Sequence, residues 1–280
     1  MSQPGTTAVA APASAPRRRV ALPTAPEFVV EIGGMFRLGA QAVSRALRAP
    51  YSYGPEFVAQ FRFALRLSLF PLVVTSFALS FGPAGIQASN FLGLFGALDR
   101  LGGLYVLIVV REFAPLVSGI VVAGVAGTAI CADLGARVVR EEVSALSVLG
   151  IDPVKSLVVP RLLALVLVCV LCDVLSLLSG LVGALAVIVQ NDAPLGPFFS
   201  AFFSTATPLE LGASFVKCAL YGVAIALVSC YKGLHAKGGP EGVGRAVNQS
   251  VVVTFLAIGA IDYAFTQFLL ATNPILSAVR

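Results

Sequence analysis

A polar segment from Asp133 to Asp152 interrupts two long apolar runs, and its charged side chains could bind a soluble protein through ion pairs and hydrogen bonds. Read as a helix, the segment also carries an apolar stripe, formed by Val139, Val143, Leu146 and Leu149. The charges alone fit an ordinary solvated connection equally well. A connection without a partner is usually shorter, however, and has no reason to keep an apolar stripe. We therefore expect an amphipathic surface helix that docks a soluble partner.

Residues at the end of this polar segment predict where one helix stops and the next begins. Gly150 tolerates the left-handed conformation that often follows a helix. Asp152 followed by Pro153 is typical of a helix N-cap with proline at the first helical position. We expect a new helix to begin at Pro153.

Arg111 and Glu112 lie inside an apolar run and are the leading candidates for a buried polar site. An ionised side chain is costly in hydrocarbon, so it normally faces protein or a wet cavity. On a helix these neighbours point about 100° apart, so each needs another partner or a polar group of a ligand. The planar guanidinium suits a carboxylate or phosphate, such as a lipid headgroup, and ion or proton relay is the alternative. Weaker candidates, for which a structural role fits equally well, are Asp173, Glu210, Lys217 and Asp262.

Several catalytic chemistries lack the residues they need. The five cysteines lie in or beside apolar runs and are interpreted as small packing residues rather than disulfides. His235 is the only histidine, which argues against a histidine metal site or a Ser–His–Asp triad. The glycine-rich stretch 238–244 lacks the Lys-Ser/Thr ending of a phosphate loop. We expect no cofactor or metal in this chain, so that ATP and Mg, if used, would be bound by a separate ATPase.

The amino-acid composition indicates what kind of secondary structure carries these candidate residues. The 280 residues are 58% hydrophobic and only 12% charged, with a mean hydropathy of +0.92, which predicts an all-α integral membrane protein. In a membrane protein, an excess of basic residues such as this net charge of +5 usually marks the cytoplasmic loops. We therefore do not expect nucleic-acid binding.

The apolar runs divide the chain into about five membrane spans. We expect a disordered cytoplasmic tail over 1–26 and an interfacial amphipathic helix over 27–48. Residues 82–100 and 191–208 are expected to be a glycine-broken connection and a polar connection. The predicted transmembrane segments are 61–81, 103–131, 157–190, 211–231 and 247–271.

The basic residues predict how these spans are oriented. Fifteen of the nineteen Lys and Arg lie before or at the start of the first span, around the polar segment, or in the loop 232–245. These three regions share one side of a five-span chain. The positive-inside rule therefore places the N-terminus and the polar segment in the cytoplasm.

Two stretches carry a resemblance to a known family. The run 111–161, REFAPLVSGIVVAGVAGTAICADLGARVVREEVSALSVLGIDPVKSLVVPR, and the run 238–253, GGPEGVGRAVNQSVVV, closely resemble MlaE/YrbE permeases of ABC transporters. The sequence motifs ICADLGAR and SCYKGL are most similar to those of an A-type YrbE subunit of an Mce lipid-import system. The resemblance implies a permease domain over 27–280, with residues 133–152 as a cytoplasmic coupling helix.

The resemblance also implies partners and site residues. The partners would be a cytoplasmic ABC ATPase dimer, a second permease of the B type, MCE-domain substrate-binding proteins and membrane lipids. Arg111 and Glu112 would line the lipid pocket. Ser144 departs from the family, which often has an acidic residue there, so that this ATPase contact would either be missing or be made by Glu141 or Glu142. The implied ATPase-coupling residues are Asp133, Arg137, Arg140, Glu141, Glu142, Leu146, Gly150, Asp152 and Pro153.

The main hypothesis is a non-catalytic, multi-pass subunit of an ATP-driven lipid importer in the bacterial inner membrane, with fatty acids, sterols or phospholipids as substrates. An ion-coupled secondary transporter that uses Arg111, Glu112 and Asp173 remains open, although it should show inverted repeats and no clear repeat is found. A membrane-embedded lipid-modifying enzyme is the third alternative, and it lacks a nucleophile–base pair.

Overall fold

The computed structural model describes residues 25–48 and 53–273, and within these ranges it contains helices and no strand. Five of its helices are long and apolar enough to cross a membrane. The prediction of an all-α integral membrane protein with five spans is therefore confirmed. The five helices are Gly54–Gly93, Leu98–Val139, Val154–Gln190, Pro208–Leu234 and Gly239–Thr272.

Each of these helices contains the corresponding predicted span, and most of them extend beyond it because a helix need not stop where hydrocarbon ends. The first span consists of α2 (Gly54–Leu79), η1 (Ser80–Ile86) and α3 (Gln87–Gly93). Residues 82–93 are thus helical, so the prediction of a glycine-broken connection over 82–100 is wrong for most of its length. The second span is η2 (Leu98–Arg100), α4 (Leu101–Tyr105), η3 (Val106–Phe113), α5 (Ala114–Val122), η4 (Ala123–Gly127) and α6 (Thr128–Val139).

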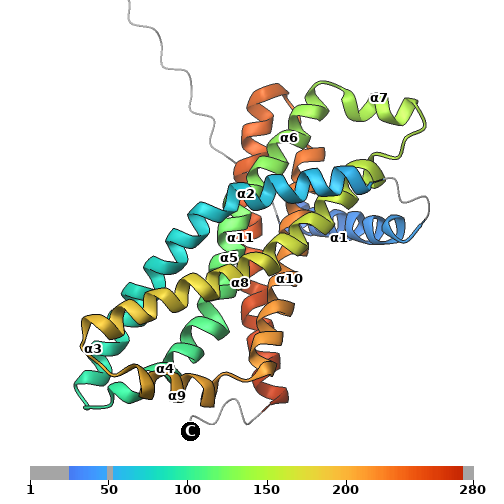
Figure 1. The fold of residues 1–280 in the computed structure, drawn as a ribbon. Helices are drawn as coiled ribbons and strands as arrows, with labels where there is room; N and C mark the ends of the chain where they lie inside the picture. Colours follow the sequence, from blue (N-terminus) through green and yellow to red (C-terminus); the bar gives the residue numbers. More distant parts are fainter. Residues whose placement is uncertain (1–24, 49–52, 274–280) are drawn as a thin grey trace, which may run out of the picture.

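The short helix α7 (Glu142–Val148) separates the second and third spans at one end of the molecule (Figure 1). The remaining elements are η5 (Val154–Val158), α8 (Val159–Gln190), α9 (Leu195–Thr205), α10 (Pro208–Leu234) and α11 (Gly239–Thr272). The prediction of a polar connection over 191–208 is wrong, because most of this segment is the helix α9 and only the residues around it are non-helical. Asn191 and Asp192 form a turn, and the phenylalanine-rich stretch after Pro194 forms α9.

Helix α1 (Ala25–Ala46) lies across the bundle and occupies most of the predicted interfacial segment 27–48 (Figure 1). Met35, Leu38 and Ala42 are buried against the other helices. A second set of apolar residues on α1 is exposed, namely Val29, Val30, Phe36 and Val43. This two-sided pattern fits a helix that lies on the core and touches a membrane surface, although the bilayer contact stays a prediction. The predicted tail 1–26 falls mostly outside the described residues.

Four π-helical stretches, η1, η3, η4 and η5, interrupt the spans. A π-turn adds a residue to the helical ladder, and such bulges are frequent at functional sites. The stretch η3 contains both Arg111 and Glu112. The local winding therefore differs from a regular α-helix where the sequence places its leading polar pair.

Small residues let α8 and α10 approach each other closely. A Cβ atom on Gly222 would lie 2.6 Å from the Cα atom of Val166. Gly212, on the same helix α10, has open space around its Cα atom. The contact between the two helices thus depends on the absence of a side chain at position 222.

The variant Gly222→Ala is expected to lower the free energy of unfolding by about 1–3 kcal/mol, because the added methyl group overpacks the α8–α10 contact. Thermal unfolding of the purified chain measures this. The matched control Gly212→Ala should be neutral or stabilise the helix by about 0.5–1 kcal/mol. Equal melting temperatures for the two variants would contradict the close contact.

Candidate functional site

Arg111 is paired with a residue of the fourth span. Its Nη2 atom lies 2.5 Å from Oε1 of Glu210, which is only 2% exposed. Glu210 also belongs to a capping box at the start of α10, in which Thr207 Oγ1 accepts a hydrogen bond from the Glu210 N–H. The carboxylate that holds Arg111 is therefore fixed to the first turn of α10.

Lys217, about two turns further along α10, holds the neighbouring carboxylate. Its Nζ atom lies 3.2 Å from Oε2 of Glu112 and 2.9 Å from Oδ1 of Asp262. It also donates to the carbonyl oxygen of Arg111, at 3.1 Å, and to Oγ1 of Thr266, at 3.0 Å. The ammonium group is buried, so these contacts replace its hydration.

Two hydroxyl groups complete the arrangement. Thr266 Oγ1 donates to Oε1 of Glu112 at 3.1 Å, and the hydroxyl group of Tyr221 donates to Oδ1 of Asp262. Asp262 and Thr266 lie one turn apart on α11. The second, fourth and fifth spans thus meet in one polar group, which we call the charged cluster. Its members are Arg111, Glu112, Glu210, Lys217, Tyr221, Asp262 and Thr266.

The charged cluster confirms that Arg111 and Glu112 do not pair with each other and that each has another partner. Those partners are two of the residues that the sequence ranked lower, Glu210 and Lys217, and a third such residue, Asp262, pairs in turn with Lys217. With every group ionised, the cluster holds two cationic and three acidic side chains, so it carries one excess negative charge. Arg111 is therefore already neutralised within the chain.

Asp173 lies near this cluster but contacts it only indirectly. Its Oδ2 atom accepts a hydrogen bond of 2.6 Å from Ser214, one turn before Lys217 on α10. Its Oδ1 atom has no hydrogen-bond partner among the described residues, and the side chain is fully buried. The sequence placed Asp173, one of the weaker candidates, inside the third span; the structure shows it buried there, with a serine as its hydrogen-bond partner.

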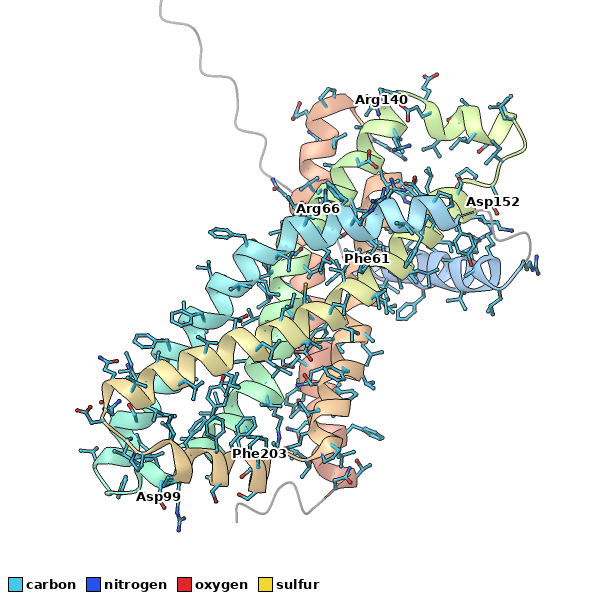
Figure 2. The ribbon with its side chains drawn as sticks, viewed as in Figure 1. Phe61, Arg66, Asp99, Arg140, Asp152 and Phe203 are labelled. Carbon is cyan, nitrogen blue, oxygen red and sulfur yellow. The ribbon has the colours of Figure 1, made fainter. Side chains whose placement is uncertain are left out.

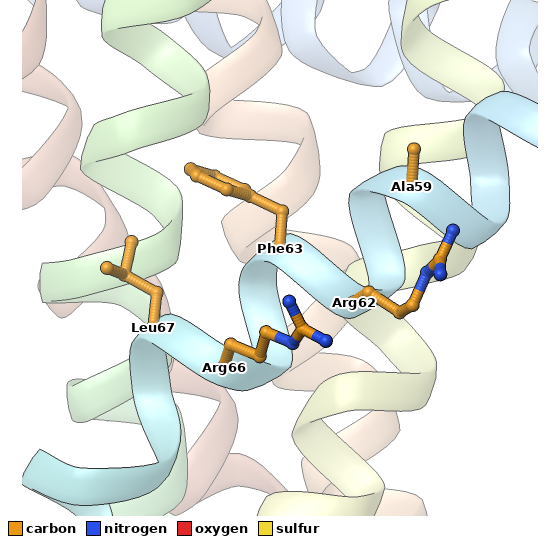
Figure 3. A pocket seen from close by; sticks show the side chains of 5 residues that line it. All are labelled: Ala59, Arg62, Phe63, Arg66 and Leu67. Carbon is orange, nitrogen blue, oxygen red and sulfur yellow. The ribbon is translucent and has the colours of Figure 1, made fainter.

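An open groove of about 450 Å³ lies on α2, away from the charged cluster (Figure 3). Arg62 and Arg66 line it one turn apart, together with Ala59, Phe63 and Leu67. Both arginines are exposed, and no ion pair joins either of them to another residue in the described ranges. None of the five lining residues belongs to the charged cluster, so the lipid pocket assigned to Arg111 and Glu112 stays a prediction.

The polar segment 133–152 is not one helix, so the expected continuous coupling helix is wrong in its geometry. Helix α6 continues from the second span to Val139, and α7 begins at Glu142. Glu141 has a φ of 60°, a conformation that non-glycine residues rarely adopt. Helical periodicity cannot detect such a break. We call residues 140–152, which follow α6, the docking island, after the role that the sequence predicts for them and that stays a prediction.

The end of α7 has the geometry that the sequence predicts. Gly150 has a φ of 75°, and its N–H donates to Ser147 O while the N–H of Ile151 donates to Leu146 O. These two bonds form a Schellman motif. Asp152 Oδ1 then accepts from the Val154 N–H at 3.0 Å, and Pro153 is the first helical residue, directly before η5 of the third span. The expected stop and N-cap are confirmed.

The expected apolar stripe divides into two parts. Val143 and Leu146 are partly buried and pack against the core of the bundle. Val148 and Leu149 are 88% and 73% exposed, and Ile151 is also exposed. Leu146 therefore belongs to the base of the docking island, and its exposed apolar surface is formed by Val148, Leu149 and Ile151. We call these three residues the apolar tip.

Ion pairs hold the base of this region against the bundle. Asp133 Oδ2 lies 2.6 Å from Nη2 of Arg161, a fully buried side chain of α8 that the sequence did not single out. Asp133 also pairs with Arg137, and Asp152 pairs with Arg45 of α1 at 2.7 Å. Arg140 pairs with Glu142 across the break. Asp133 and Asp152 thus orient the docking island within the chain.

The docking island lies at one end of the molecule, and α9 lies at the opposite end (Figure 1). Figure 2 shows Arg140 and Asp152 at one end, and Asp99 and Phe203 at the other. Five membrane-length helices, with a charged cluster between three of them, define a multi-pass membrane protein rather than a single-span anchor.

Comparison with known proteins gives the family. The sequence model of the family described as "Permease MlaE" matches residues 57–268. This range covers well over half of the chain, and the chain therefore belongs to the MlaE permease family.

Curated relatives agree with this family. A probable ABC transporter permease protein of Rickettsia felis is 29% identical over 242 residues, which are 86% of this chain and 93% of the relative. A probable ABC transporter permease protein of Synechocystis is 35% identical over 62% of this chain and 66% of the relative. The chloroplastic protein TRIGALACTOSYLDIACYLGLYCEROL 1 of Arabidopsis thaliana is 31% identical over 62% of this chain and 50% of that protein. The chain is thus a permease subunit of an ABC transporter, and such a subunit works with an ATPase.

Proposed function

We propose that this permease forms the transmembrane lipid pathway of an ATP-driven importer of the Mce type in the bacterial inner membrane. The docking island faces the cytoplasm and binds the ATPase dimer. A second permease, of the B type, packs beside the chain, and MCE-domain proteins supply lipid on the other side. ATP and Mg belong to the ATPase.

The observation that carries the ATPase part of this proposal is the apolar tip. A loop with no partner would not keep Val148 and Leu149 in water beside charged residues. The charge distribution supports the orientation, because the basic residues gather at the end that carries the island. The lipid part is supported by the name of the Arabidopsis relative, which contains that of a galactolipid.

The charged cluster is the proposed headgroup site, with Arg111 as the donor and Glu210 as its resident counter-ion. An anionic headgroup that binds Arg111 must replace the Glu210 carboxylate, which the capping box holds in place. The carboxylate or phosphate of the lipid headgroup would then take the place of Glu210 at the planar guanidinium, which can bind such a group through two parallel hydrogen bonds. Substrate binding and the α10 N-terminus are coupled in this way.

The experiment is purification of the chain with its co-expressed neighbours, followed by lipid analysis and ATP-driven lipid transfer in liposomes. We expect ATPase and lipid to co-purify. The paired variant Arg111→Leu, Glu210→Gln should reduce bound lipid several-fold while the ATPase remains bound, because it removes the donor without leaving a buried carboxylate unpaired.

The single variant Glu210→Gln is the matched control, since it keeps Arg111 and removes the carboxylate that competes with a lipid headgroup for the guanidinium. An anionic lipid should bind this variant at least as well as it binds the unaltered protein. Unchanged lipid in the paired variant would contradict the headgroup site. Lipid uptake driven by an ion gradient without any ATPase would favour the alternative, an ion-coupled secondary transporter.

A further inference from the structure

Helix α9 is an apolar, uncharged element at the end of the molecule opposite the docking island (Figure 1). Residues 193–209, which include α9, contain no Asp, Glu, Lys or Arg. The helix itself carries four phenylalanines, at positions 198, 199, 202 and 203. A stretch of seventeen residues without charge is unusual for a connection exposed to water.

One edge of α9 is firmly packed against the second span. A Cβ atom on Gly102 would collide with the carbonyl oxygen of Phe198 and would lie 2.8 Å from the backbone N of Phe202. The rings of Phe198 and Phe202 lie 6.2 and 6.4 Å from that of Tyr105. This contact fixes the orientation of α9. The side chains on the other edge of the helix therefore point away from the second span.

That other edge exposes large apolar side chains. Phe203 is 71% exposed, and Leu195 is also exposed. The end of α3 and the turn after it lie at the same end of the molecule and expose three more such residues. Residues of α3 and α9 also share one hydrophobic cluster, which links the two elements. We call the exposed set the apolar rim; it consists of Phe91, Leu94, Phe95, Leu195 and Phe203.

The connection to α10 sets the depth of α9 in the membrane. Helix α10 begins at Pro208, three residues after α9 ends, and has 27 residues. About 20 helical residues cross the hydrocarbon, so the first turn of α10 reaches the membrane–water interface. Helix α9 and its exposed edge therefore lie at the level of the lipid headgroups and upper acyl chains.

We propose that the apolar rim is immersed in the lipid leaflet at the end opposite the docking island, which is the extracytoplasmic leaflet in the proposed orientation. Aromatic and aliphatic side chains at this level bury their surface among acyl chains. An uncharged edge offers no charge complementarity to a soluble protein, so lipid is the occupant that fits it. Thr207 and Glu210 follow α9 directly, so this leaflet adjoins the charged cluster.

Tryptophan fluorescence tests the proposal, because the chain contains no tryptophan of its own. The variant Phe203→Trp would be reconstituted as the full chain in bilayers with and without brominated acyl chains. We expect bromine quenching several-fold stronger than in the control Val148→Trp, whose indole lies in water at the apolar tip. Aqueous acrylamide should quench in the reverse order.

Strong acrylamide quenching of Phe203→Trp together with weak bromine quenching would overturn the proposal, since the rim would then face water and be open to an extracytoplasmic protein. The variant Leu195→Trp reports on the same edge of α9 and decides the question if Phe203→Trp fails to fold. Neither measurement involves the ATPase or a transported lipid. The result therefore stands apart from the success or failure of the proposed transport function.

Discussion

Replacement of Lys217 by methionine is expected to lower the free energy of unfolding by about 3–5 kcal/mol. The ammonium group lies between the carboxylates of Glu112 and Asp262, and it is buried. Without it, two acidic groups face each other among apolar helices with no cation to balance them. Denaturant-induced unfolding of the purified chain in detergent measures the loss.

The control for this experiment is Lys237→Met, which removes the same group from an exposed position and should change stability by no more than about 0.5 kcal/mol. Addition of Asp262→Asn to Lys217→Met should restore part of the stability, because one unpaired carboxylate is removed. A Lys217→Met protein as stable as the control would show that the cluster does not join the three spans.

The sequence predicts the spans well because hydropathy is a local property. Twenty apolar residues indicate a membrane helix whatever lies beside them. The same holds for Gly150 and Asp152, whose roles depend only on the next few residues of the backbone. These predictions therefore agree with the structure.

The partners of Arg111 and Glu112 could not be predicted, because they depend on how distant spans pack. Glu210 and Lys217 follow about a hundred residues later, and near the start of α10 they resemble ordinary interface residues. The physical argument that two adjacent helical charges cannot pair did predict that partners exist. It gave no way to select them among the other buried charges.

Two errors have local causes that periodicity hides. Glu141 adopts a positive φ, which breaks the polar segment into α6 and α7 although its apolar spacing continues. The prediction of a polar connection over 191–208 missed the apolar, phenylalanine-rich stretch that forms α9. The orientation of the docking island also depends on Arg161, whose role appears only when α6 and α8 are placed side by side.

The paired variant Val148→Asp, Leu149→Asp is expected to abolish co-purification of the ATPase. Burial of two such side chains contributes roughly 3–6 kcal/mol, which corresponds to a loss of about 10²- to 10⁴-fold in affinity, and each new carboxylate adds a desolvation cost. The permease itself should unfold as before, because both side chains are exposed in the isolated chain. Size-exclusion chromatography and ATPase assays of the co-expressed complex measure the outcome.

The matched control is Ser144→Asp, Ser147→Asp, which adds the same two charges to α7 at exposed polar positions. It should keep the ATPase bound, since no apolar contact is lost. Equal loss of the ATPase in both paired variants would show that added negative charge, rather than the apolar tip, governs docking. Full retention in Val148→Asp, Leu149→Asp would exclude the tip from the interface and leave Arg140 and Glu141, the charged residues exposed at the break before α7, as the better place to look.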